Sequence, residues 1–390
     1  MCEDWMVTAH CDWNKCLGGE GGSAWLLLKE RGQPAVSRKM RRRGEVVECE
    51  EEDWRVESVS EAVLRVLLPG PERTVYLVAP SASHSVAGRV TSLDVSGGGL
   101  GLFSAGSRSV SVMDTRAGTV RRELEGHLGD VYTARIFPSG VVALTGGADM
   151  RLKIWSMQTG DCPVTLSGHT GPVMDTAIVT RGKNIISVSK DGTARLWSCG
   201  QANCLGVLLT LTETINCCHL AERTMFHPLE TEAASDPAEV DTEDKVLAVG
   251  GEEGTVSVVS VSSRAVLHSS NLDSPVNAVL LTEDKLYVGC QDGAVHIISQ
   301  AGTEVIRAST SPVLSMMRLA STHQVLVSRQ DGSVSLYLAQ ARVELTGSDT
   351  DPVYCLAEDE DHVYTGCRDG EVRKYDRRTV LNLVKLCNKK

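Results

Sequence analysis

The chain of 390 residues contains no run of eighteen apolar residues and no N-terminal basic segment followed by an apolar one. The first absence argues against a transmembrane helix, and the second argues against a secretory signal peptide. An excess of basic residues is also missing, because 39 lysines and arginines are outnumbered by 50 aspartates and glutamates, for a formal net charge of −11. Nucleic acids require a basic surface, so this charge argues against them as partners.

Motifs that carry catalysis are missing as well. The sequence has no P-loop, no Gly-x-Ser-x-Gly nucleophile elbow and no paired-histidine metal motif. The thirteen cysteines form only loose clusters such as Cys217-Cys218-His219, without two ligand pairs at zinc-finger spacing. Without a secretion signal, they are expected to be reduced thiols. We therefore expect no cofactor, no metal and no enzymatic activity.

The sequence does contain a register of evenly spaced positions. One step, from Trp197 to Val259, is longer than the others by about twenty residues, whereas the rest are near 40. In six of the seven units an acidic residue precedes the marker by six positions. The marker series is Met113, Trp155, Trp197, Val259, Ile298, Tyr337 and Tyr375. A second series in the same phase is Val90, Val131, Val173, Ile215, Val276, Val313 and Val353. A period near 40 residues predicts a fold of equal supersecondary units.

Each unit has the pattern of short strands joined by tight turns. Residues 184–188 and 194–197 flank the turn Lys190-Asp191-Gly192, and an Asp-Gly pair in that setting favours a hairpin because glycine accepts a positive φ. Sheets of four short strands must pack radially on their neighbours to bury both faces. The seven units predict an all-β, seven-bladed propeller over residues 76–390, preceded by a small β-rich domain over residues 1–75.

An open propeller would expose strand edges, so we expect a strand within residues 75–86 to pair with the last unit and close the ring. Residues 380–386 are the alternative source of that strand.

Two units share four residues at identical spacings. One set is His127, Thr145, Asp149 and Trp155, and the other is His169, Ser187, Asp191 and Trp197. Both sets resemble the structural tetrad of WD repeats. The resemblance implies a hydrogen-bonded chain from the histidine to the tryptophan that satisfies buried polar groups and locks the turn to its blade. We interpret these residues as scaffold and not as ligands or catalysts.

Two segments depart from the repeat pattern. Residues 38–43 are basic except for Met40 and are followed by an acidic run at 48–53, which predicts a self-compensating surface hairpin, with a nuclear-import signal as the alternative. The long step places extra residues at about 222–244. They are acidic and poor in large apolar groups, which predicts a disordered surface loop, with a docking segment as the alternative.

The chain as a whole resembles the family of proteasomal ATPase-associated factors. The resemblance is carried by segments such as 122–127, 175–179, 191–197 and 351–354. It implies a non-catalytic assembly chaperone that binds the C-terminal domain of an ATPase subunit of the proteasome regulatory particle and assists assembly of its base. We expect a cytoplasmic monomer, with the nucleus as a second location. The alternative function is a substrate receptor or adaptor of a ubiquitin ligase, docked through the N-terminal region.

On a WD propeller, residues beside each first strand and before each acidic turn lie on the top face. The expected partner-binding residues there are Asp130, Tyr132, Lys190, Asp349, Asp351, Tyr354 and Arg368. Tyr132 and Tyr354 are the expected anchors because interface hot spots favour tyrosine, and the acids are expected to attract a basic partner. In a closed ring the second and seventh units would be one blade apart, which would join these residues in a single patch.

Overall fold

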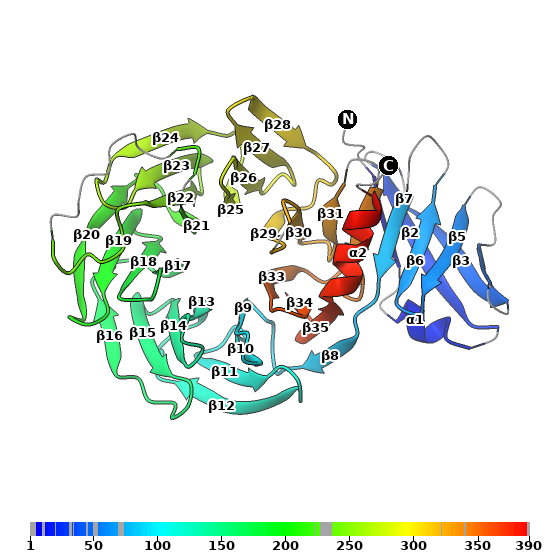
Figure 1. Cartoon of the computed structure of the whole chain (residues 1–390), viewed down its shortest axis with the longest axis horizontal. Coiled ribbons are helices and arrows are strands. Elements are labelled where there is room, and N and C mark those ends of the chain that lie inside the picture. The colour runs from blue at the N-terminus through cyan, green and yellow to red at the C-terminus, as the bar shows by residue number, and fades with distance from the viewer. Residues whose placement is uncertain are drawn as a thin grey trace. The chain divides into compact units, whose positions relative to one another are not determined.

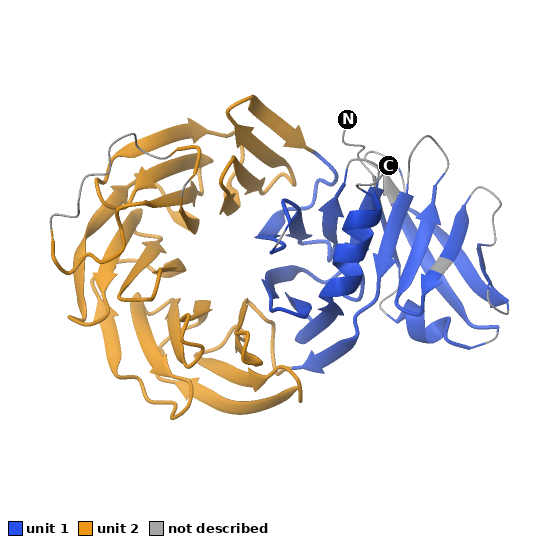
Figure 2. Ribbon diagram, in the orientation of Figure 1, with its two compact units in different colours: residues 1–85, 307–390 blue, residues 86–306 orange. Residues whose placement is uncertain are grey.

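Strands make up most of the computed structural model. It describes residues 5–9, 12–19, 21–30, 33, 35–43, 46–49, 54–68, 74–222, 224–226, 236–320, 322–338 and 341–387. Helices in these ranges are α1 (Trp13–Cys16) and α2 (Arg377–Cys387), and neither is long and apolar enough to cross a membrane. The chain divides into two compact units: unit 1 is residues 1–85 with 307–390, and unit 2 is residues 86–306 (Figure 2).

The described part of unit 2 forms five antiparallel sheets of four strands, one for each repeat. The first two sheets are β9 (Ser92–Val95), β10 (Leu100–Ser104), β11 (Ser109–Asp114) and β12 (Thr119–Glu125), then β13 (Val131–Ile136), β14 (Val142–Gly147), β15 (Arg151–Ser156) and β16 (Val164–Ser167). The next two are β17 (Val173–Val179), β18 (Asn184–Ser189), β19 (Thr193–Ser198) and β20 (Asn203–Thr210), then β21 (Ile215–Glu222), β22 (Lys245–Gly251), β23 (Thr255–Ser260) and β24 (Val266–Asn271). The fifth is β25 (Val276–Leu281), β26 (Lys285–Cys290), β27 (Val295–Ser299) and β28 (Gly302–Ile306). The first strand of each sheet lies on the inner side of the unit and the last on the outer side (Figure 1).

Each inner strand of unit 2 is an edge strand of its sheet. Polar side chains from a neighbouring sheet accept hydrogen bonds from backbone N–H groups of these strands. Asp94 on β9 accepts the N–H of Ile136 on β13 at 2.7 Å, and Nδ1 of His219 on β21 accepts the N–H of Leu281 on β25 at 3.3 Å. Burial, followed by the nearby Arg135, lowers the pKa of His219 to about 4, so its ring stays neutral and can accept this bond. These side chains thus satisfy backbone donors that have no partner within their own sheet.

The insertion in the fourth repeat is ordered where the structure describes it. Asn184 on β18 donates to the carbonyl of Ala238 at 3.0 Å and accepts the N–H of Val240 at 2.7 Å. Glu239 is buried and pairs with Arg264. The expectation of a disordered loop is therefore wrong for residues 224–226 and 236–244, while residues 223 and 227–235 lie outside the described ranges.

The described residues of unit 1 form three sheets. The first is β1 (Trp5–Ala9), β2 (Ser23–Glu30), β3 (Val36–Arg43) and β4 (Val46–Cys49). The second, in spatial order, is β29 (Val313–Arg318), β30 (Val325–Arg329), β31 (Val334–Tyr337), β32 (Ala341–Leu345), β7 (Thr74–Val78), β6 (Val63–Leu67) and β5 (Arg55–Ser60). The third is β33 (Val353–Glu358), β34 (His362–Cys367), β35 (Glu371–Asp376) and β8 (Ala82–Ser85).

Consecutive N-terminal strands join two different repeats of unit 1. β7 pairs in parallel with β32, which extends the sixth repeat into a seven-stranded sheet instead of the expected four-stranded blade. The expected boundary near residue 75 falls within β7. β8 pairs antiparallel with β35, so the strand expected within residues 75–86 is the fourth strand of the last repeat. Residues 380–386 lie in helix α2, and the alternative that they supply this strand is wrong.

Helix α2 has both a start signal and a buried face. Asp376 accepts the N–H of Thr379 at 2.9 Å, which caps the first turn. The helix then buries Val380, Leu383 and Val384 in a core shared with β32 and β34.

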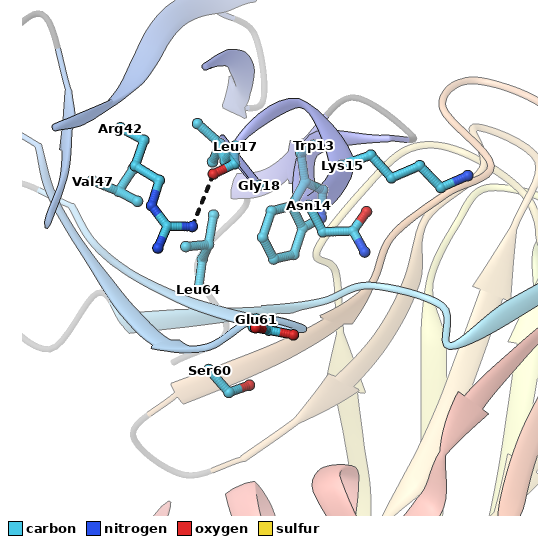
Figure 3. A pocket seen from close by; sticks show the side chains of 10 residues that line it. All are labelled: Trp13, Asn14, Lys15, Leu17, Gly18, Arg42, Val47, Ser60, Glu61 and Leu64. Atoms are coloured by element: carbon cyan, nitrogen blue, oxygen red, sulfur yellow. Dashed lines mark hydrogen bonds between the residues drawn. The ribbon is translucent and has the colours of Figure 1, made fainter. Parts of the chain in front are cut away.

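The N-terminal sheet packs on β5, β6 and β7 through a common apolar core. Trp13 of α1 belongs to this core, and its Nε1–H donates to Oγ1 of Thr346 at 2.7 Å. A polar hollow of about 280 Å³ lies beside Trp13, and Arg42 donates across it to the carbonyl of Leu17 at 3.1 Å (Figure 3). The basic run lies on β3, where Arg41 faces Glu48 of β4 in register and Arg43 lies 3.4 Å from Glu48. The acidic residues 50–53 lie outside the described ranges.

Candidate partner-binding surface

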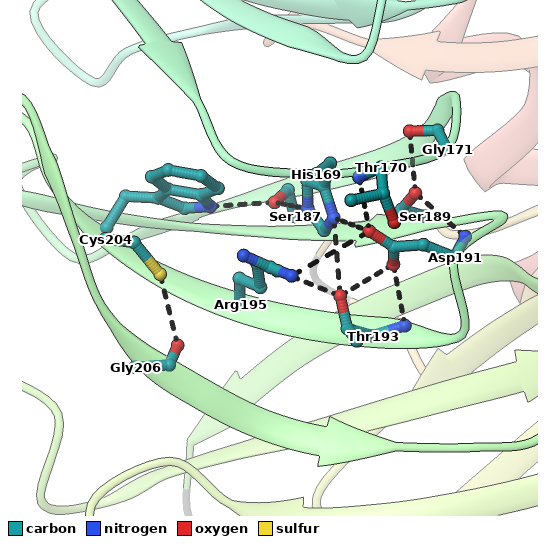
Figure 4. A network of polar contacts seen from close by, with 11 residues as sticks. His169, Thr170, Gly171, Ser187, Ser189, Asp191, Thr193, Arg195, Cys204 and Gly206 are labelled. Carbon is teal, nitrogen blue, oxygen red and sulfur yellow. Dashed lines mark hydrogen bonds and ion pairs between the residues drawn. The ribbon is translucent and has the colours of Figure 1, made fainter.

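The structure brings each set of tetrad residues together in one hydrogen-bonded chain. In the third repeat, Nδ1 of His169 lies 2.8 Å from Asp191, Nε2 lies 2.7 Å from Oγ of Ser187, and Nε1–H of Trp197 donates to Ser187 at 2.8 Å (Figure 4). In the second repeat, the corresponding distances are 2.9 Å from His127 to Asp149, 2.7 Å from His127 to Thr145, and 2.8 Å from Trp155 to Thr145. A hydroxyl that accepts from the indole donates to Nε2, so the Nδ1–H of each histidine faces the aspartate.

Electrostatics keep both histidines neutral and both aspartates charged. Burial lowers the pKa of His127 and of His169 below the ordinary value, although the neighbouring aspartate opposes this. Burial alone would raise the pKa of Asp191, but hydrogen bonds from Thr193, Thr170 and His169 lower it. All polar atoms of the network are engaged with one another, so the tetrads have the geometry of a scaffold.

Other repeats hold the turn aspartate with different partners. In the sixth repeat Ser309 donates to Asp331 at 3.2 Å. In the seventh, the guanidinium of Arg373 donates to Asp369, and Tyr375 donates to the carbonyl of Thr346 at 2.7 Å. The turn is therefore anchored in these repeats even though the sequence lacks the histidine and tryptophan.

A β-bulge recurs at one phase of the repeat and sets which residues are exposed. The register shifts directly after the first residue of β13, β17, β21, β25, β29 and β33. The residue skipped at each bulge is partly exposed and directly follows a fully buried one, because a bulge re-aims its side chain. These residues are Tyr132, Met174, Asn216, Asn277, Leu314 and Tyr354. Both expected tyrosine anchors thus occupy bulge positions.

Three of the expected binding residues lie in unit 2. Asp130 is half-exposed and lies 3.9 Å from Arg89, Tyr132 follows it at the start of β13, and Lys190 is exposed in the turn before Asp191. The four others lie in unit 1.

In unit 1, Asp349, Asp351 and Tyr354 belong to the β32–β33 connection and its strand, and Arg368 belongs to the β34–β35 turn. Arg368 pairs with Asp351 at 2.7 Å. This hydrogen bond, together with the charge of Asp351, raises the pKa of Arg368. An arginine thus accompanies Asp130 in one unit and Asp351 in the other, so neither carboxylate presents an isolated negative charge.

Asp349 contributes to a feature that sequence reasoning missed, an apolar hollow of about 450 Å³ in unit 1. Its walls are Thr8, Ala9, Trp25, Leu26, Leu27, Ser37, Asp349 and Thr350. Trp25 is 50% exposed, whereas its neighbours Ala24 and Leu26 are buried. The alternation on β2 was the available signal, since a tryptophan between two buried positions of a strand points to the opposite face.

Within the described ranges, no group of three or more His, Cys, Asp or Glu is placed to hold a metal ion.

The repeats, tetrads and recurring bulges define a WD-repeat protein of the β-propeller class. A model of the family "WD domain, G-beta repeat" matches residues 118–156, 160–198 and 340–376. The chain is 35% identical over 382 residues to Proteasomal ATPase-associated factor 1 of Homo sapiens, covering 93% of this chain and 96% of that protein. It is 34% identical over 380 residues to the Gallus gallus protein of the same name, with the same coverage. The chain belongs to the proteasomal ATPase-associated factor 1 family.

Proposed function

We propose that this protein is a non-catalytic assembly chaperone that binds the C-terminal domain of an AAA ATPase subunit of the proteasome regulatory particle and assists assembly of the base. The observation that carries the proposal is the similarity over 93% of the chain to proteins named for association with proteasomal ATPases. At 93% of the chain, the similarity extends well beyond the three segments that the WD-repeat model matches. We further propose that the protein is a cytoplasmic monomer, with the nucleus as a second location.

The tetrads support a role without catalysis. A general base must be able to take a proton from a substrate, but Nε2 of His127 and His169 already accepts a hydroxyl hydrogen inside the blade. Burial also keeps both imidazoles neutral and away from solvent.

The proposed binding surface is the set of loop and bulge residues on each unit: Asp130, Tyr132 and Lys190 on unit 2, and Asp349, Asp351, Tyr354 and Arg368 on unit 1. The tyrosines are partly exposed at the bulges of β13 and β33, which suits them as anchors. Ion-paired acids such as Asp351 contribute more to selectivity and to the rate of encounter than to final affinity. A basic partner domain fits the net charge of −11.

Calorimetry against the isolated C-terminal domain of each ATPase subunit tests the proposal. The double variant Asp130→Lys, Asp351→Lys should bind roughly tenfold more weakly or worse, because it repels a basic partner and places each lysine beside an arginine. The melting temperature should hardly change, since neither residue is in a tetrad. The matched control reverses two exposed acids elsewhere on unit 2, Glu283→Lys with Glu304→Lys, and should bind as the wild type does.

Two results would contradict the proposal at different levels. Binding that is unaffected by the double variant would remove these residues from the interface. Absence of binding by the wild type to every ATPase domain, with recovery of cullin-type ligase subunits from cells instead, would favour the adaptor function.

A further inference from the structure

The outer face of the N-terminal sheet carries a preformed apolar hollow next to the proposed binding loop. Thr8, Leu27 and Ser37 face one another across β1, β2 and β3, and the next row pairs Trp25 with Lys39. All these side chains project from the face opposite the buried Leu26 and Met40. The hollow of about 450 Å³ lies at the end of the sheet where this face meets Asp349 and Thr350.

Trp25 is an exposed aromatic group in a fixed position. Half of the residue is open to solvent, and Nζ of Lys39 lies 5.8 Å from the centre of its ring. The ammonium group interacts favourably with the ring and leaves apolar surface of the indole available at the hollow. Tryptophan is enriched among the residues that dominate binding energy, which makes this half-exposed ring a candidate anchor.

The opposite wall of the hollow is rigid and carries a carboxylate. Asp349 has a φ of 50°, a left-handed conformation. The loop around it is fixed by the hydrogen bond from Asp351 N–H to the carbonyl of Ser348 at 2.9 Å and by the bond from the Ser348 hydroxyl to the carbonyl of Gly332. Among the described residues, no hydrogen bond or ion pair engages the Asp349 carboxylate. A partly exposed acid in a fixed loop can therefore meet a cation without rearrangement.

We propose that the N-terminal sheet takes part in partner binding and that the hollow receives a large apolar side chain of the ATPase domain, with an adjacent lysine or arginine of that domain pairing with Asp349. This inference rests on the proposed function and adds to it a specific anchor site. Two observations select this occupant. The exposed surface of the hollow is mostly apolar and Asp349 is the charged residue of its lining, which calls for an apolar group next to a positive charge. Asp349 of the hollow also lies two positions before Asp351 in the β32–β33 connection, which leads directly into Tyr354 on β33, so one partner can engage both.

The test measures binding of the full-length protein to the isolated ATPase C-terminal domain that binds the wild type. Trp25→Ala should weaken binding at least tenfold, because it removes the aromatic wall of the hollow that contacts the partner's apolar side chain. Thr8→Arg, which fills the hollow and keeps Trp25, should cause a similar loss. Asp349→Asn should weaken binding severalfold and reduce its salt dependence; asparagine accepts the positive φ, so only the charge is removed. Val266→Ala, at a valine that is 53% exposed on β24, is the control and should bind normally.

Failure of this inference can be separated from failure of the proposed function. If Trp25→Ala, Thr8→Arg and Asp349→Asn all bind like the wild type while Tyr354→Ala weakens binding, the hollow is not an anchor site and the chaperone proposal stands. If the wild type binds no ATPase domain, the proposed function fails first. Sedimentation that shows a dimer dissociated by Trp25→Ala would assign the hollow to a second copy of this chain and overturn the inference.

Discussion

At the scale of single residues, each tetrad histidine bonds two partners at once, one through each ring nitrogen. His169 joins the turn carboxylate of Asp191 to the strand hydroxyl of Ser187, and both contacts are shielded from solvent. Removal of the ring leaves a buried acceptor and a buried hydroxyl without their shared partner.

We expect His169→Ala to lower the free energy of unfolding by about 1–3 kcal/mol, because buried polar groups lose their hydrogen bonds. Urea unfolding at constant pH measures the change. Thr170→Ala should have little effect, because the exposed Thr170 bonds Asp191 through its backbone N–H and not through its side chain. A loss below about half a kcal/mol for His169→Ala would contradict the scaffold interpretation.

The same residue predicts a pH dependence. The pKa of His169 in the folded protein lies below the value of 6.5 for a free histidine, so the unfolded chain takes up a proton first as the pH falls. The contribution of His169 to stability is therefore complete above pH 6.5 and is lost as the pH falls through the folded pKa. The stability gap between the wild type and His169→Ala should shrink between pH 6.5 and 5.5.

The comparison with the variant is needed because another group acts in the opposite direction. Burial raises the pKa of Glu344 in unit 1 to about 7, and this group favours the folded state as the pH falls. Glu344 is common to both proteins, so its effect cancels in the difference. Urea midpoints at pH 7.5, 6.5 and 5.5 and constant ionic strength measure the gap; a gap that widens at low pH would refute the assignment.

At the scale of elements, the periodic pattern predicted the inner strands well. The series Val131, Val173, Ile215, Val276, Val313 and Val353 marks the first residue of six inner strands, and each of these side chains is fully buried. This succeeds because the repeat imposes the same local environment in every blade. Residues 380–386 were ambiguous because a short run of valine and leucine suits a strand or a helix. The cap at Asp376 and the spacing of Val380, Leu383 and Val384 were the signals for the helix.

Helix α2 offers a matched pair of leucines for testing its role. Leu383 is 5% exposed and packs in the core of the last repeats, whereas Leu386 is 50% exposed. Leu383→Ala should cost about 2–5 kcal/mol, because it removes buried methyl groups and leaves a cavity. Leu386→Ala should stay within about 0.5 kcal/mol of the wild type. Equal effects of the two substitutions in urea unfolding would show that α2 does not pack through the face described here.

At the scale of the whole molecule, the pairings that sequence reasoning missed are those between distant segments. The parallel pair of β7 with β32 has no local signature, because nothing in residues 74–78 specifies which strand lies beside them. The hollow beside Trp25 likewise depends on a loop more than three hundred positions away in the chain. The tetrads were predictable because their four residues lie within one repeat unit and recur at fixed spacing.

Deletion of residues 1–85 tests the importance of these distant pairings. The truncation removes β7 and β8 and leaves β32 and β35 as unpaired edges with apolar neighbours. We expect the product to aggregate, because unpaired edges template further strand pairing. Co-expression of residues 1–85 as a separate fragment should restore a soluble complex. Size-exclusion chromatography and thermal unfolding report both results, and a soluble, cooperatively unfolding truncation would contradict the expectation.

The pairing of the N-terminal strands β7 and β8 with β32 and β35 of the last two repeats has a consequence for biosynthesis. Val78 and its partner Thr346 are 268 positions apart, so a ribosome adding about 5–20 residues per second leaves β7 paired with β6 but without β32 for roughly 13 to 54 seconds. Unit 2 is a continuous segment that is synthesised during that interval, while Tyr76 and Val78, whose core partners are mostly in residues 319–384, remain without them. A nascent chain with these apolar side chains exposed is a natural client for a general chaperone. A protein proposed to assist the assembly of another complex would thus itself need a chaperone during synthesis.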